Sequence, residues 1–355
     1  MKLQHFREEI DNIDDKILEL LDKRMEIVKR IGKTKTTNNI PIYHPKREQE
    51  IINRLSAKNP NFLTKSAIEA IYLEVFAVSR NLELPEKVAY LGPIGSYTHQ
   101  AAESRFGAMC EYFSHNTIQS TIKSLESGRV SYAVIPIENN QNGFVGETLD
   151  LLRDTRYNIV AEVYMPIHHC FASLSEKLDE IEVLYSKDIA FGQCFNFLNE
   201  HSLDHIERIP VESTAKAAQL ASENKKSAAI CSSIASKLYN VPVMFDNIED
   251  TSGNKTRFII MSNFKNQKSG NDKTTIFANL EGSDKPGVLY QLLYDVRDLN
   301  INMTSIQSRP SKMNGNFEYC FFIDIDGHID DANVSELFSR YRKELKWLGS
   351  YLKNC

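Results

Sequence analysis

The stretch from residue 132 to residue 152 constrains the fold most, because an apolar run passes there into a polar loop and then into a helical pattern. Tyr132–Ile135 is apolar and has β character. Pro136 has no amide to donate to a ladder and predicts that a strand ends there. The loop contains glycines, and Glu147–Leu152 begins a helix-like run. A strand that leads through a polar loop into a helix is typical of open α/β sheets, which hold ligands at the carboxyl ends of their strands.

The loop carries side chains that can bind a ligand. Glu138, Asn139 and Asn140 follow the predicted strand. Loop amides and the N-terminus of the helix beyond them favour an anion. An ordinary surface loop is the alternative, and the local pattern leaves the two interpretations equally open.

Composition indicates an ordinary globular protein. The chain has 355 residues, of which 42% are hydrophobic and 25% charged, and this length suggests two or three domains. A net charge of −5 argues against a general nucleic-acid binder. No apolar run is long enough to cross a bilayer, and the charged start lacks a signal-peptide core. We therefore expect a cytoplasmic protein that binds neither nucleic acid nor membrane.

The cysteines indicate reduced thiols and no metal site. All six are scattered, without a CxxC motif or a Cys/His cluster. Such spacing is typical of cytoplasmic proteins without structural disulfides.

Two breaks divide the chain into three domains. Residues 84–87 separate a helical pattern from a strand pattern, and the polar residues 264–272 have the composition of a flexible linker. The predicted domains are residues 1–85, 87–264 and 273–355, each of plausible size.

The first segment is predicted to be helical. Apolar residues recur at helical spacing from Phe6 to Ile31, and no Pro or Gly intervenes before Gly32. The predicted helix runs from about residue 5 to the mid-thirties, which exceeds the usual 8–20 residues. A segment of three helices covers such a helix poorly, so we expect a second chain, and hence a homodimer or tetramer.

Cations interrupt this apolar stripe. Arg24 and Lys35 lie on it, and Arg7 lies beside its start. A second helix is expected near Pro45, and it carries Arg47 and Glu48. Ser79 and Glu83 continue the apolar face of a third helix. Unpaired buried charge is costly, so we interpret the cations as a pocket for a dicarboxylate. The alternative is that each side chain extends outward from its helix.

The first segment resembles the all-helical chorismate mutase family. The motifs that carry the resemblance are FREEID with Arg7, LDKRMEIVKRIGKTK with Arg24 and Lys35, PKREQE with Arg47 and Glu48, and SRNLE with Ser79. The resemblance implies that chorismate is held by Arg7 of the partner chain together with Arg24, Lys35, His44, Arg47, Glu48, Ser79 and Glu83.

The resemblance also implies the chemistry. Conversion of chorismate to prephenate needs no nucleophile or cofactor, only a held reactive conformer and stabilised charge on the ether oxygen. Lys35 and Glu83 would flank that oxygen as catalytic residues. His44 stands where the family commonly has Asp, and Glu83 where Gln is common. A glutamate donates only when protonated, so we expect the mutase to prefer acidic pH, and a flat pH profile would contradict this.

Strand and helix patterns alternate in the middle segment, which predicts α/β architecture with a ligand cleft between two lobes. The loop with Gly95, Ser96 and Thr98 leads into a helix and offers another anion site. His168 and His169 are expected in a strand, where their side chains point to opposite faces, so they are not a metal pair. Further strands are expected at 88–91, 159–163, 168–172, 183–186, 228–231 and 256–261, and a helix from residue 191.

The middle segment resembles prephenate dehydratase. The motifs YLGPIGSYTHQAA, YAVIPIENNQNGFVGETLDLL, ESTAKAA and TRFIIM occur in the family's order and spacing. The resemblance implies a two-lobed fold like that of periplasmic binding proteins. Thr256 would assist the departing hydroxyl, and Arg257 would orient a carboxylate. The remaining cleft residues would be Thr98, Glu138, Asn139, Ser186, Gln193, Ser213, Thr214 and Phe258. Residues 185–188 depart from the family, which more often has Ser-His-Pro-Gln there.

The last segment has the order βαββαβ, which is the ferredoxin-like plan. Its strands are expected at 274–280, 301–310, 317–326 and 347–352, with helices from 285 and over 334–345. The segment resembles the ACT regulatory domain through its PGVL and SRP motifs, although Gln307 replaces the usual Glu. Phenylalanine would bind there as an inhibitor, and a purely structural dimerisation module is the alternative. The implied effector residues are Gly287, Val288, Leu289, Gln307, Ser308, Arg309 and Pro310.

Together the resemblances imply a bifunctional enzyme that carries chorismate to phenylpyruvate without a metal or an organic cofactor. One alternative is a monofunctional dehydratase whose helical segment is only a dimerisation arm. A second alternative is a regulator that binds an aromatic acid without converting it.

Overall fold

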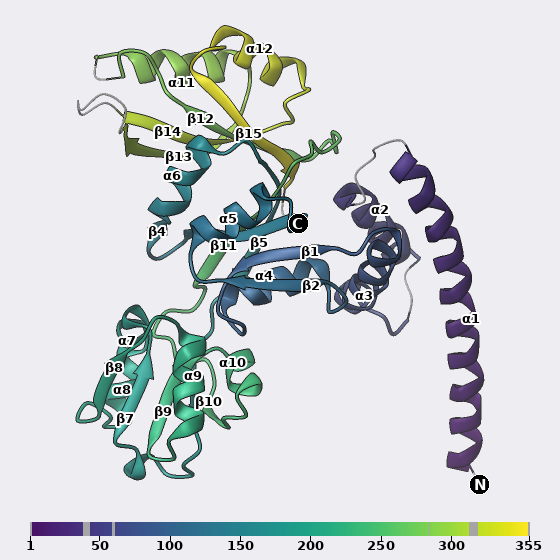
Figure 1. Ribbon diagram of the computed structural model, residues 1–355, viewed down its shortest axis with the longest axis vertical. Helices are drawn as coiled ribbons and strands as arrows, with labels where there is room; N and C mark the ends of the chain where they lie inside the picture. Colours follow the sequence, from purple (N-terminus) through teal and green to yellow (C-terminus); the bar gives the residue numbers. More distant parts are fainter. Residues whose placement is uncertain (1, 38–42, 59–60, 284, 312–318, 354–355) are drawn as a thin grey trace. The chain divides into compact units, whose positions relative to one another are not determined.

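The computed structural model describes residues 2–37, 43–58, 61–283, 285–311 and 319–353 (Figure 1). The chain divides into unit 1, Met1–Lys87 with Phe106–Glu111, and unit 2, Val88–Arg105 with Tyr112–Cys355. The break predicted near residue 85 coincides with the end of the helical part, whereas the predicted second and third domains lie in one unit. No helix in the described ranges combines the length and the apolar character needed to span a membrane.

Three helices form unit 1: α1 (Lys2–Thr37), α2 (Pro45–Ser56) and α3 (Lys65–Glu83). Pro45 occupies the first position of α2, where its missing amide costs nothing. Thr64 caps α3 because its hydroxyl accepts from the Ala67 amide at 3.2 Å. A small core of Ile52, Ile68 and Phe76 holds α2 against α3.

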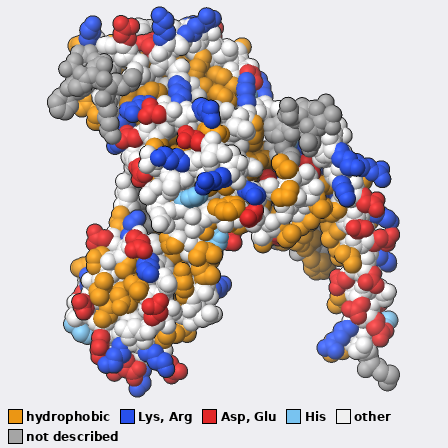
Figure 2. Space-filling view, in the orientation of Figure 1, with side chains coloured by type: hydrophobic (Ala, Val, Ile, Leu, Met, Phe, Trp, Pro, Cys, Tyr) orange, Lys and Arg blue, Asp and Glu red, His pale blue; other side chains and the backbone are white. Residues whose placement is uncertain are grey.

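The predicted long helix is confirmed, and much of its apolar stripe is exposed. Phe6, Ile10, Ile13 and Ile17 remain 55%, 56%, 54% and 48% accessible. Figure 2 shows charged side chains along the face of α1 that is turned to the viewer. The helix is therefore amphipathic, and in a single chain the first half of its apolar face stays uncovered.

The first lobe of unit 2 is built on a six-stranded sheet with the order β2-β1-β3-β11-β5, to which β4 adds by pairing with β3. Its strands are β1 (Lys87–Leu91), β2 (Glu111–His115), β3 (Tyr132–Asn139), β4 (Gly143–Phe144), β5 (Asn158–Pro166) and β11 (Lys255–Ser262). Its helices are α4 (Tyr97–Phe106), α5 (Ile118–Glu126) and α6 (Gly146–Asp154).

The second lobe has its own five-stranded sheet with the order β10-β6-β9-β7-β8. The chain enters this lobe after β5 and returns for β11, so two crossings join the lobes, as the two-lobed prediction requires. The strands are β6 (Cys170–Ser173), β7 (Val183–Ser186), β8 (Glu207–Pro210), β9 (Ser227–Cys231) and β10 (Val243–Phe245). The helices are η1 (Leu178–Glu180), α7 (Asp188–Gln193), α8 (Phe195–Glu200), α9 (Thr214–Glu223) and α10 (Ser233–Leu238).

The C-terminal sheet has the order β13-β14-β12-β15 and confirms the βαββαβ prediction. The two helices lie on one face of this sheet (Figure 1). The elements are β12 (Asp272–Ala278), α11 (Val288–Asp298), β13 (Met303–Pro310), β14 (Tyr319–Asp326), α12 (Ala332–Arg340) and β15 (Leu345–Leu352). The first two residues of the strand predicted over 317–326 lie outside the described residues.

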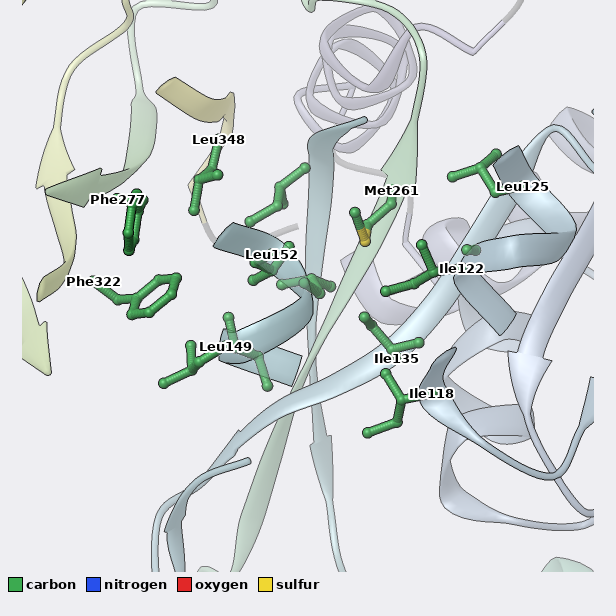
Figure 3. Packing of buried hydrophobic residues seen from close by; sticks show 14 of the residues in the cluster. Ile118, Ile122, Leu125, Ile135, Leu149, Leu152, Met261, Phe277, Phe322 and Leu348 are labelled. Carbon is green, nitrogen blue, oxygen red and sulfur yellow. The ribbon is translucent and has the colours of Figure 1, made fainter. Parts of the chain in front are cut away.

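One hydrophobic core joins the first lobe to the other face of the C-terminal sheet. Leu149 and Leu152 of α6 lie between Ile135 of β3 and the pair Phe277 and Phe322 (Figure 3). At Gly349 the backbones approach so closely that an added Cβ would lie 2.1 Å from the Ile159 carbonyl oxygen. The second and third predicted domains therefore pack as one body.

Three predictions about elements are wrong. Pro136 does not end β3, because the parallel partner β1 pairs only with residues 132–134, and the antiparallel pairing with β11 shifts register beside Pro136. Pro136 is tolerated because it lies beyond the pairing of β3 with β1 and beside the bulge in the pairing of β3 with β11. His168 and His169 precede β6 instead of lying in it. The helix expected from residue 191 is broken at Cys194 into α7 and α8.

The predicted flexible linker is held in place. The side-chain Nδ2 of Asn266 donates to the carbonyl oxygens of Val160 and Ser350 at 2.8 and 2.9 Å. The five described cysteines are buried and form no disulfide, whereas Cys355 lies outside the described residues.

Candidate active sites

Two polar pairs join α1 to α3 in unit 1. Lys35 Nζ lies 2.8 Å from Glu83 Oε2, with side-chain exposures of 16% and 8%. Gly32 allows this approach, because an added Cβ would lie 3.0 Å from Glu83 Cγ. Arg24 donates to the Ser79 hydroxyl and lies over the Phe76 ring at 5.9 Å. Burial lowers the pKa of the Arg24 guanidinium, although nearby acidic groups oppose this shift.

A buried arginine that sequence reasoning missed lies beside this site. Arg80 is 3% exposed, contacts Glu48, and places Nε 2.9 Å from Glu86 Oε2. Burial alone lowers the pKa of Arg80, but the two carboxylates outweigh burial and raise it. The sequence signal for Arg80 was its neighbour Ser79, which was predicted to face the interior. Both residues are buried on α3.

Of the other predicted mutase residues, Glu48 belongs with these pairs, because it contacts Arg80 and its charge acts on Arg24. Arg47 is exposed and pairs with Glu50 at 3.2 Å. His44 is half-buried immediately before α2. Arg7 is exposed in the second turn of α1, about 40 Å along the helix from Lys35 at 1.5 Å per residue. Within one chain Arg7 therefore cannot join Lys35, and its contribution from a partner chain stays a prediction.

Unit 2 contains a cavity of about 870 Å³ that both lobes line. Seven of the ten predicted dehydratase residues contribute to its wall: Thr98, Asn139, Gln193, Ser213, Thr214, Thr256 and Phe258. A volume of this size is ordinary for a small-molecule site.

The Thr256 hydroxyl is held by Asn139 at the wall of this cavity. Asn139 Nδ2 donates to Thr256 Oγ1 at 3.0 Å, and Asn139 Oδ1 accepts from the amides of Gln141 and Asn142 at 3.0 Å each. The asparagine amide is thus fixed by the loop that follows β3. Because Thr256 accepts this bond and has no acceptor of its own among the described residues, its hydroxyl hydrogen remains available to a ligand.

Several groups at the cavity wall can bind an anion, although the carboxylates of Glu147 and Glu212 also line it. The N-termini of α4, α6 and α9 open onto it, through lining residues that include Thr98, Glu147 and Thr214. Lys187 is the one lysine or arginine among the described lining residues. Lys187 is exposed and was not predicted as a site residue. The signal that could have identified it is its place in residues 185–188, which depart from the family pattern.

His169 is a second lining residue whose role the sequence left open. Its Nε2 lies 2.9 Å from Gln193 Oε1, and its Nδ1 lies 3.4 Å from the Tyr97 hydroxyl. Burial lowers the pKa of His169, so the neutral ring is favoured. Since the Gln193 oxygen only accepts, Nε2 carries the proton in this contact.

Three predicted residues do not reach the cavity. Glu138 and Arg257 adjoin Asn139 and Thr256 in their strands, and neighbouring side chains in a strand point to opposite faces. The Arg257 guanidinium is bound by protein groups, so its predicted contact with a substrate carboxylate is wrong. Ser186 is fully buried and donates to the Ile230 carbonyl oxygen at 2.8 Å.

The predicted effector residues lie at the start of α11 and the end of β13. Gly287 caps α11 with a φ of 92°, which favours glycine, and Val288 and Leu289 pack on the core under the helices. Ser308 and Pro310 belong to β13, and the Ser308 carbonyl accepts from Gln307 Nε2 at 3.0 Å. Arg309 reaches α6 and lies 3.4 Å from Asp150.

The described residues were also considered as ligands for a metal ion. Among the residues that the structure describes, no group of three or more His, Cys, Asp and Glu side chains is placed to hold a metal ion.

Known families match the helical segment and the segment that follows it. The family model "Chorismate mutase type II" matches residues 6–84, and the model "Prephenate dehydratase" matches residues 88–266. A bifunctional chorismate mutase/prephenate dehydratase of Aquifex aeolicus is 36% identical over 99% of this chain and 98% of its own length. The enzyme of the same description from Pseudomonas aeruginosa is 33% identical over 99% and 98%.

A solved structure agrees with the fold of unit 2. Prephenate dehydratase from Arthrobacter aurescens, in complex with L-Phe, has a TM-score of 0.69 and 28% identity, and the match covers 75% of this chain and 90% of that one. Since the similarity to curated relatives extends over nearly the whole length of both partners, the chain belongs to the bifunctional chorismate mutase/prephenate dehydratase family.

Proposed function

We propose that unit 1 rearranges chorismate to prephenate and that the cavity of unit 2 then decarboxylates and dehydrates prephenate to phenylpyruvate. Family membership supports both reactions, because relatives that carry both names align with this chain end to end. The observation that carries the site assignment is the Thr256 hydroxyl, which Asn139 holds with its hydrogen free at the cavity wall.

The mutase reaction uses the cations between α1 and α3. Arg24 and Lys35 bind the carboxylates and the ether oxygen of chorismate, and Ser79 supports Arg24. These contacts select the compact conformer in which the two reacting carbons meet. Lys35 stabilises the charge that grows on the ether oxygen as the C–O bond breaks. Glu83 can donate to the same oxygen only when protonated, so the preference for acidic pH stays a prediction.

The dehydratase reaction expels carbon dioxide and hydroxide from prephenate. Thr256 donates a hydrogen bond to the departing hydroxyl, and aromatisation of the ring drives the step. Lys187 and the three helix N-termini bind the side-chain carboxylate. The apolar part of the wall, which includes Phe258, leaves the ring carboxylate poorly solvated and favours its loss.

Regulation is assigned to the C-terminal sheet. We infer an ACT domain that binds L-phenylalanine at residues 287–289 and 307–310 and inhibits the dehydratase. The support is the βαββαβ order together with the relative from Arthrobacter aurescens, whose structure contains L-Phe. A purely structural dimerisation module remains the alternative.

The enzyme is expected to be a homodimer or a tetramer of such dimers. The exposed stripe on α1 needs a cover, and a second copy of α1 supplies an equal apolar face. The same pairing would bring the partner's Arg7 to the cations of this chain.

Substitution of Thr256 tests the assignment of separate sites. Thr256→Ala should reduce dehydratase kcat by about 100-fold or more, whereas Thr256→Ser, which keeps the hydroxyl, should retain most activity. The mutase rate of the same samples is the internal control. Equal loss of both activities in Thr256→Ala would contradict the assignment.

A further inference from the structure

A buried cluster of charges surrounds Arg257 at the junction of the first lobe and the C-terminal sheet. Arg257 Nε donates to Glu162 Oε2 at 2.8 Å, and Nη1 donates to Asp324 Oδ2 at 2.6 Å. Nη2 donates to the Tyr351 hydroxyl at 2.9 Å. Lys273 Nζ completes the cluster 2.8 Å from Glu162 Oε1. All five side chains belong to residues that are at most 5% exposed.

The cluster is a joint between two parts of unit 2. Glu162 and Arg257 belong to β5 and β11 of the first lobe, whereas Lys273, Asp324 and Tyr351 belong to the C-terminal sheet. Two cations face two carboxylates, so the core of the cluster is neutral. A further carboxylate, Glu138, lies 3.6 Å from Arg257 and is one-third exposed.

Stability alone does not account for this cluster. Burying four charges is expensive, and apolar residues of similar volume often stabilise such an interface as well or better. The planar guanidinium instead fixes the direction of the Arg257 side chain, because each of its nitrogens is bound to a different partner. The cluster therefore fixes the position of the Arg257 guanidinium between β11 and the C-terminal sheet.

That position matters because Arg257 follows Thr256. Thr256 pairs with Asn139 across the β11–β3 ladder, and the register shifts immediately after Arg257. A bulge leaves the strand locally adjustable, so the place of the Thr256 hydroxyl depends on what holds Arg257 on the opposite face. The C-terminal sheet supplies two of the three groups that do so.

We propose that Arg257 is a positioning residue through which Asp324 and Tyr351 of the C-terminal sheet hold Thr256 in place for the dehydratase reaction. This inference rests on the proposed role of Thr256. It assigns a part in dehydratase turnover to residues outside the dehydratase domain, none of which touches the substrate.

The first variant to test is Asp324→Asn, which keeps the shape and removes the charge. Dehydratase kcat should fall by about tenfold, while KM for prephenate changes by less than about twofold, because Thr256 is proposed to act on the departing hydroxyl and not to bind the carboxylates of the substrate. The matched control is Asp295→Asn, since Asp295 also binds an arginine and a tyrosine of the same sheet domain, at 2.9 and 2.6 Å, away from Arg257. Tyr351→Phe is the milder variant if Asp324→Asn folds poorly, and the mutase rate of each full-length sample reports folding of unit 1.

A double-mutant cycle separates positioning from a general loss of stability. If the cluster acts through Thr256, the effect of Asp324→Asn should largely vanish in a Thr256→Ala background. Full additivity of the two effects would overturn the inference, as would a dehydratase kcat in Asp324→Asn equal to that of Asp295→Asn. Failure of the proposed function gives a different result, because Thr256→Ala alone would then retain activity.

Discussion

Lys187 provides the sharpest prediction about the dehydratase cavity. The substrate carries two carboxylates, and Lys187 is the one lysine or arginine among the described residues of the wall. A hydrogen bond to a charged group contributes about 1.5–3 kcal/mol, and the exposure of Lys187 reduces this to about 1–2 kcal/mol. Lys187→Met, which keeps the chain length and removes the charge, should therefore lower kcat/KM for prephenate by about 5- to 30-fold.

The assay is steady-state formation of phenylpyruvate from prephenate at two ionic strengths. The wild-type KM should rise with salt, and the KM of Lys187→Met should rise less, because screening acts only where the charge is present. Lys177→Met is the matched control, since Lys177 lies in the same lobe, is 70% exposed and pairs with Glu180. A kcat/KM for Lys187→Met within about twofold of the Lys177→Met value would refute the assignment of Lys187 to the substrate.

Two further predictions concern the partner chain and pH. Arg7→Ala and Lys35→Ala should each abolish mutase activity. If the two variants are unfolded, mixed and refolded together, about a quarter of the wild-type number of active sites should return. The reason is that half of the dimers would contain one chain of each variant, and each mixed dimer would hold one intact site. No recovery in the mixture would show that Arg7 acts within its own chain or not at all. The pKa of His169 is held below its ordinary value of 6.5 by burial, so the unfolded chain binds more protons than the fold as pH falls below that value. The free energy of unfolding should therefore fall with pH below about 6.5, and denaturant titrations at pH 7.5 and 5.5 should show a smaller fall for His169→Gln. An equal fall for both proteins would contradict the burial of a neutral ring.

Periodicity predicted the elements well where the pattern was long. The apolar spacing from Phe6 to Ile31 predicted α1 almost to its ends, because a helix repeats one local rule over many turns. The βαββαβ order of the last segment followed from the same kind of pattern. Pro136 was misread because its tolerance depends on the register of β3 with two other strands, and a single sequence does not contain that register.

Sequence reasoning found those cavity residues that lie at the ends of their own strands or helices. Asn139 and Thr256 were both assigned to the cleft, and their residues prove to be cross-strand partners. Arg257 was misassigned although it adjoins Thr256. The alternation of side chains along a strand places Thr256 and Arg257 on opposite faces of the sheet. Only the tertiary structure shows that Glu162, Asp324 and Tyr351 bind Arg257 on its face. Arg80 was missed for the same reason, since its partners Glu48 and Glu86 come from other parts of unit 1.

The most direct test of the account follows chorismate with the purified full-length chain and quantifies prephenate and phenylpyruvate separately, with and without L-phenylalanine. The account predicts that chorismate is consumed, that phenylpyruvate forms, and that phenylalanine suppresses phenylpyruvate formation while prephenate accumulates. Turnover of added prephenate without consumption of chorismate would contradict the mutase assignment and leave unit 1 as a dimerisation arm. No turnover of either compound would contradict the central claim and favour a regulator that only binds an aromatic acid.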